Sequence, residues 1–64
     1  MLRSECIKIK GLVLDCQFYV IEDFVNNMEE VQHLQHAYLN GVDIVHVITE
    51  QFEEDLINEY YKTL

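Results

Sequence analysis

Hydrophobic and polar residues alternate near the start of the chain, where Ile7 and Ile9 flank Lys8. Alternation with a period of two, combined with β-branched residues, is typical of a strand. We therefore predict a first strand within residues 5–15, with Gly11 marking a bulge or a bend in it.

The following segment, residues 17–22, is rich in aromatic and β-branched residues and predicts a second strand. The alternative is a helix that reaches back to residue 16, because Val20, Phe24 and Met28 are spaced by four. We favour the strand.

A helical spacing of apolar residues dominates the middle of the chain. Its members fall on one side of a helix drawn at about 100° per residue, and they are Phe24, Met28, Val31, Leu34, Tyr38 and Leu39. Asn26 or Asn27 would cap the start of this helix, and the left-handed residues of an Asn40–Gly41 pair would end it.

The next apolar run, residues 42–49, is nearly all β-branched and predicts a central strand covered on both faces. Thr49 then caps a final helix at about residues 50–63. The predicted fold is a small two-layer α+β domain over residues 1–64, with about three strands and two helices in the order ββαβα. Both helices would lie on one face of the sheet, and the last strand would follow a right-handed crossover.

This arrangement leaves one face of the sheet uncovered. The predicted strand over residues 42–49 nevertheless carries apolar residues on both faces, with Ile44 and Ile48 on one and Val45 and Val47 on the other. A second copy of the chain is the simplest cover, so we expect a homodimer. A chain of 64 residues also buries only a small core, which favours association.

Charge is distributed very unevenly along the chain. Twelve acidic residues oppose four basic ones, and three of the basic residues (Arg3, Lys8 and Lys10) lie in the first ten positions. Such a chain repels nucleic acid and anionic lipid and attracts basic surfaces. Direct binding to DNA or RNA is therefore the function that the sequence argues against most firmly.

The two cysteines, Cys6 and Cys16, lack the spacing of a metal or redox motif. We expect both thiols to be free and the protein to be cytoplasmic, since no secretory signal or membrane-spanning run is recognisable. A Cys6–Cys16 disulfide across a hairpin is the alternative.

A weak metal-binding hypothesis rests on Glu29, His33 and His36, which would project from the polar face of the predicted middle helix. The commoner explanation of such residues is an ordinary solvated face. His46 lies within an apolar run and is expected to be a hydrogen-bonded histidine of the core or of an interface. No cofactor is expected.

Catalysis has little support in the sequence. The two glycines form no phosphate-binding loop, and the few hydroxyl residues lie near the chain ends or serve as a cap. A chain this short also rarely encloses a pocket. We expect a protein that is not an enzyme.

The stretch EQFEEDLINEYY, residues 50–61, carries the strongest functional hypothesis. Carboxylates interleaved with aromatic residues suit a basic partner, and the candidate contact residues are Glu53, Asp55, Glu59, Tyr60 and Tyr61. The favoured function is an inhibitor or regulator that binds the basic, nucleic-acid-binding surface of a partner, in the manner of DNA mimics of phage or bacterial origin. A homodimeric assembly module is the alternative, and a histidine-based metal-binding module is a minor one.

Overall fold

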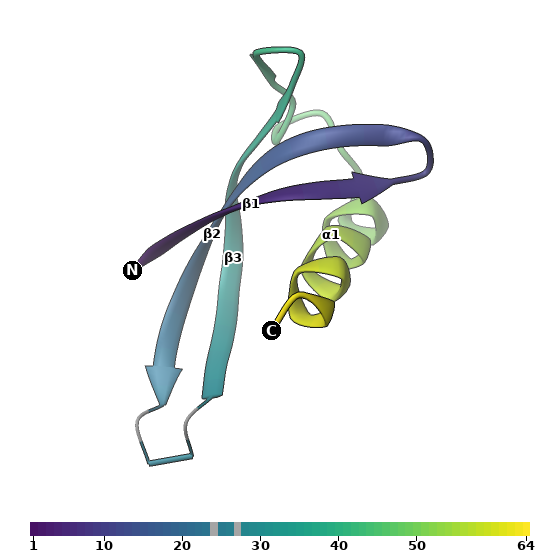
Figure 1. Ribbon diagram of the computed structural model, residues 1–64. Coiled ribbons are helices and arrows are strands. Elements are labelled where there is room, and N and C mark those ends of the chain that lie inside the picture. The colour runs from purple at the N-terminus through teal and green to yellow at the C-terminus, as the bar shows by residue number, and fades with distance from the viewer. Residues whose placement is uncertain (24, 27) are drawn as a thin grey trace.

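The computed structural model describes residues 1–23, 25–26 and 28–64. These described residues form four strands and then one helix. The elements in chain order are β1 (Leu2–Ile9), β2 (Leu12–Asp23), β3 (Met28–Leu39), β4 (Val42–Asp43) and α1 (Glu50–Lys62). Of these, β1, β2, β3 and α1 are labelled in Figure 1.

The four strands form a single antiparallel sheet in the order β1-β2-β3-β4. Two-residue turns close two of its hairpins. Lys10 and Gly11 join β1 to β2 with φ angles of 50° and 77°, and Asn40 and Gly41 join β3 to β4 with φ angles of 52° and 83°. Positive φ at both central residues defines the turn that matches the twist of a hairpin, and Asn-Gly is its favoured sequence.

The predicted ββαβα order with two helices is therefore wrong, although the domain remains a small mixed α+β fold. Gly11 belongs to a turn between two strands rather than to a bulge within one. Asn40–Gly41 belongs to a hairpin rather than to a helix end. The misinterpretation of Asn40–Gly41 arises because left-handed Asn and Gly serve hairpin turns and helix ends alike. The alternative helix from residue 16 is also absent, because β2 runs through that segment.

The middle helix is replaced by β3 because two irregularities change the spacing of its inward residues. The register of β3 against β2 shifts between Gln17 and Phe18 and again between Tyr19 and Val20, so that β3 gains one residue at each place. The inward side chains of β3 consequently lie at positions 31, 34, 37 and 39. Apolar residues three positions apart also lie on one side of a helix, so this spacing in β3 resembles a helical pattern. Two residues of the earlier prediction, Phe24 and the cap candidate Asn27, lie outside the described residues.

The predicted central strand over residues 42–49 is also wrong, because β4 ends at Asp43. The carboxylate of Asp43 accepts the backbone N–H of Val45 at 3.1 Å, and Val47 donates its backbone N–H to the Ile44 carbonyl at 3.0 Å. These local bonds turn the chain away from the sheet. His46 is exposed, so it is not a core histidine.

The predicted final helix is confirmed. The Thr49 hydroxyl accepts the backbone N–H of Phe52 at 3.1 Å, which is the expected N-terminal cap. Leu56 and Tyr60 are buried against the sheet, and Phe18 meets the Tyr60 ring with centroids 4.7 Å apart.

The core lies between α1 and one face of a strongly curved sheet (Figure 1). Its buried residues come from β1, β2, β3 and α1, and they are Ile7, Leu14, Cys16, Phe18, Val20, Leu34, Ala37, Leu56 and Tyr60. The tip of the β1–β2 hairpin reaches the first turns of α1, where Lys10 Nζ lies 3.6 Å from the Asp55 carboxylate and 5.6 Å from the centre of the Phe52 ring. One face of the sheet is thus covered and the other is not.

Candidate functional site

Tyr60 joins α1 to β3 and does not face solvent. It is only 3% exposed, and its hydroxyl donates to Glu29 Oε2 at 2.6 Å. Burial and this bond raise the pKa of Tyr60 to about 12. The same bond, with help from Arg3, holds the pKa of Glu29 below its ordinary value. Tyr60 is therefore a packing residue with a polar anchor.

Arg3 completes a network at this end of the sheet. Its Nε donates to Glu29 Oε1 at 3.0 Å, and its terminal nitrogen forms an ion pair with Glu22. The guanidinium thus links two carboxylates from β2 and β3 beside α1, and the negative charge of Glu29 raises the pKa of Arg3. The network binds three strands to the helix.

Two further candidates, Glu53 and Tyr61, cap the outer edge of β3. The Tyr61 hydroxyl accepts the backbone N–H of Val31 at 2.8 Å. Glu53 Oε1 lies 3.5 Å from the backbone nitrogen of Leu34 and accepts a longer bond from it. The sequence showed a carboxylate at position 53 beside apolar residues, and its place on the strand edge supplies the reason.

Asp55 and Glu59 have partners on the surface. Asp55 faces Lys10 from the first hairpin and accepts a bond from Gln51 at 3.1 Å. Glu59 accepts from Lys62 at 2.9 Å. The structure thus assigns an intramolecular contact to each of the five candidates from α1, and it brings them together on no single exposed patch.

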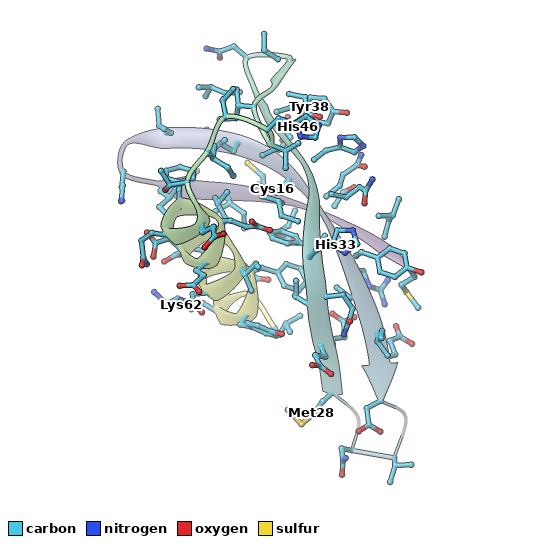
Figure 2. The ribbon with its side chains drawn as sticks, turned by 180° about the vertical axis from the view of Figure 1, so that it is seen from behind. Cys16, Met28, His33, Tyr38, His46 and Lys62 are labelled. Carbon is cyan, nitrogen blue, oxygen red and sulfur yellow. The ribbon has the colours of Figure 1, made fainter. Side chains whose placement is uncertain are left out.

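The sheet face opposite α1 presents a different group of residues, which we call the open face. Stacked ring pairs lie along it: Tyr19 with His33 at 5.4 Å and 5° between planes, and His36 with Tyr38 at 5.6 Å and 28°. His33 and Tyr38 extend from the side of β3 away from the helix (Figure 2). The aliphatic members of the open face are half or more exposed, and they are Leu2 (54%), Val13 (53%) and Ile21 (50%).

Carboxylates lie on the open face and at its end. Asp15 pairs in register with Tyr38, and Glu30 pairs with Ile21, so both lie on this face. Asp43 lies at its end, where its Oδ2 is 2.6 Å from His36 Nδ1. This bond with His36 lowers the pKa of Asp43 most, and the bonds from the backbone N–H groups of Val45 and Ala37 lower it further, so the carboxylate stays charged.

Two shallow hollows lie on the surface. One, of ≈ 220 Å³, is on the open face and is lined by Ser4, Glu5, Cys6, Asp15, Cys16, Gln17 and Tyr38. The other, of ≈ 290 Å³, lies at the far end of the β2–β3 hairpin and is lined by Asp23, Met28, Glu29, Glu30 and Tyr61. Three carboxylates beside an aromatic ring and a thioether favour a cationic side chain as the occupant of the second hollow.

The weak metal candidates are separated by the sheet. Glu29 lies on the helix side, where it contacts Tyr60, whereas His33 and His36 lie on the open face. His33 Nε2 contacts Gln35 Oε1 at 2.8 Å. In the part of the chain that the structure describes, no three His, Cys, Asp or Glu residues gather as metal ligands would.

Both cysteines are free thiols. Cys6 is exposed, whereas Cys16 is buried, and burial raises the pKa of Cys16 to about 11. Their register pairs Cys6 with Asp15 and Cys16 with Glu5, so their side chains lie on opposite faces of the sheet. The alternative disulfide is therefore absent.

Comparison with known proteins finds no matching family model, no matching curated protein and no matching solved structure. Within the described residues, no helix is long and apolar enough to cross a bilayer. Sequence reasoning expected an uncovered sheet face but missed the residues that form the open face, because it assigned β3 to a helix. The Asn40–Gly41 pair, read as a hairpin turn, was the signal that could have found it.

Proposed function

We propose that the protein is a small acidic interaction module that binds a basic partner protein, as an inhibitor or regulator of that partner, and that the open face is its contact surface. The observation that supports this most is the uncovered face itself. It carries stacked aromatic rings, half-exposed aliphatic residues and carboxylates.

Each part of this surface has a role in binding. Tyr side chains supply large contact area with little loss of conformational freedom, and buried aromatic anchors carry much of the energy of interfaces. Asp15, Glu30 and Asp43 complement cationic side chains around those anchors. Lys8 is the single basic residue of β1 that alternates onto this face. The net charge of −8 adds long-range attraction to a basic protein.

The nucleic-acid-binding character of the partner belongs to the same proposal. A basic surface that the open face can cover is the kind of surface that binds a phosphate backbone, so the module would compete with DNA or RNA for it. We place this activity in the cytoplasm, where both thiols stay reduced.

The experiment begins with a partner captured from a cell lysate on the immobilised protein at low salt. The affinity of the purified partner is then measured at low and moderate salt, with duplex DNA as a competitor. We expect a steep loss of affinity with salt and displacement by DNA. Binding that ignores both salt and DNA would contradict the proposal.

Two matched double variants locate the contact surface. Asp15→Asn with Glu30→Gln removes two carboxylates from the open face, and Asp55→Asn with Glu59→Gln removes two carboxylates from α1. We expect the first pair to weaken binding at least tenfold and the second to change it by less than threefold. The reverse order would move the contact surface to α1, where the sequence first suggested it.

A further inference from the structure

The outer edge of β1 is an unpaired strand edge. Met1 and Val20 exchange both of their backbone hydrogen bonds, at 2.8 and 2.9 Å, and the register from there to Ile9 is continuous. Because bonded and non-bonded pairs alternate in an antiparallel ladder, the backbone groups of Leu2, Ser4, Cys6 and Lys8 point away from β2.

These outward groups have no partner among the described residues, residues 24 and 27 being set aside. The opposite edge differs, because Tyr61, Glu53 and Asp43 accept three outward N–H groups of β3. A strand edge with four free donors and four free acceptors is a ready template for another strand. Natural sheets usually shield such an edge with a bulge, a proline, charged side chains or a covering element. β1 has a continuous register and no proline, and its charged residues Arg3, Glu5 and Lys8 are of both signs.

Charge indicates which strand fits this edge. β1 carries two basic residues and one acidic residue in a chain whose net charge is −8. Two copies of the chain repel each other over most of their surfaces, and β1 is the strand where they can approach at the lowest electrostatic cost. A two-fold axis also makes a strand edge complementary to itself.

We propose that two copies of the chain pair antiparallel through their β1 edges, with the two-fold axis at Ser4, to form a continuous eight-stranded sheet. Outward-pointing residues must pair with outward-pointing residues, and the axes that join at least three such pairs lie at Ser4, at Cys6 or between them at Glu5. An axis at Glu5 sets two carboxylates directly opposite each other, which is unfavourable.

The axis at Ser4 is favoured by charge. It pairs Arg3 of each copy with Glu5 of the other, and it pairs Leu2 with Cys6. The axis at Cys6 forms the same number of bonded pairs, since Lys10 is already in a turn, but it brings no opposite charges together. The dimer would also join the two open faces side by side. This inference concerns another surface and a different partner, and it stands whether or not the proposed function holds.

Light scattering after size exclusion measures the assembly directly, and we expect a dimer at micromolar concentration. Ser4→Pro removes one outward N–H that β2 does not use, so the fold should persist while the mass falls to that of a monomer. Ser4→Ala retains the N–H and is the matched control, which should stay dimeric. A wild-type monomer would overturn the proposal.

Disulfide trapping tests the register without relying on the proline variant. With the axis at Ser4, the two Ser4 Cα atoms lie about 5.5 Å apart, within reach of a disulfide. Ser4→Cys in a Cys6→Ser background should therefore form a linked dimer on mild oxidation. The wild-type chain, whose Cys6 faces Leu2 and whose Cys16 is buried, should not. Linkage of the wild-type chain in place of the variant would refute the axis at Ser4.

Discussion

The two edges of the sheet differ in what their outward backbone groups meet. Along β3, three successive outward N–H groups, those of Val31, Leu34 and Ala37, donate to side chains of α1 and of the β4 segment. Along β1, the outward groups have no such partners in the described part of the chain. The helix packs on one face of the sheet, and its polar side chains extend past that face to a single edge.

This contrast explains the composition of α1 better than a contact with another protein does. Tyr61 and Glu53 serve the strand edge, and Tyr60 anchors the helix to Glu29. Part of the acidic and aromatic character that drew attention in the sequence is thus used within the fold. A short chain with one helix can cover one face and one edge, and the rest of the sheet remains available for association.

Of the substitutions that test this difference between the two edges, Leu56→Ala should destabilise the fold most, because Leu56 of α1 is fully buried against the sheet. We expect a loss of about 2–5 kcal/mol in the free energy of unfolding, measured by urea denaturation. Detachment of α1 would also uncover the β3 edge, so aggregation should increase. Val47→Ala is the control, since Val47 is 79% exposed, and its stability should match that of the wild-type protein.

The next effect concerns pH. The Tyr60 hydroxyl bond, and after it Arg3, lower the pKa of Glu29 in the folded state. Because folding lowers the pKa of Glu29, its carboxylate stabilises the folded protein at pH values above its ordinary pKa of 4.5. This stabilisation disappears as the pH falls through the pKa of Glu29 in the folded state. Stability should therefore decline below about pH 4.5, and part of this decline should vanish in Tyr60→Phe.

Chemical denaturation at neutral and acidic pH gives the two profiles, and Tyr19→Phe is the matched control. Tyr19 lies on the open face, and its hydroxyl has no bond to any described residue. If Tyr60→Phe and the wild-type protein lose the same free energy on acidification, the bond to Glu29 does not couple the helix to the sheet.

The elements that could be predicted from the sequence are those whose signals lie within one short segment of the chain. Thr49 and the stripe of Phe52, Leu56 and Tyr60 are local signals of a capped amphipathic helix, and α1 follows them. The inward positions of β3 depend on two register shifts against β2, which no local pattern reveals. Their spacing of three was interpreted as a helix, so the β3 residues of the open face were not identified.

The candidate residues of α1 show the same division. Burial of Tyr60 follows from the helical stripe, since it lies four residues after Leu56. The bonds of Glu53 and Tyr61 to the edge of β3 require knowledge that β3 is a strand and that its edge lies beside α1. Pairing of Asp55 with Lys10 likewise depends on where the first hairpin ends. The contacts that helical spacing does predict are Glu59 with Lys62 and Asp55 with Gln51.

The smallest effect should come from the side chains that cap the β3 edge. Tyr61→Phe removes the oxygen that accepts the Val31 N–H, and we expect a loss of about 0.5–1.5 kcal/mol. Glu53→Ala should cost less, because the bond to Leu34 is longer at 3.5 Å. Amide hydrogen exchange resolves the two, since each variant should accelerate exchange at its own bonded residue. The outward amides of Ser4 and Cys6 on β1 should exchange fast once the wild-type chain is diluted to the monomer, whatever happens to α1. Slow exchange there at high dilution would mean that the two edges are equally protected, and the contrast between them would fail.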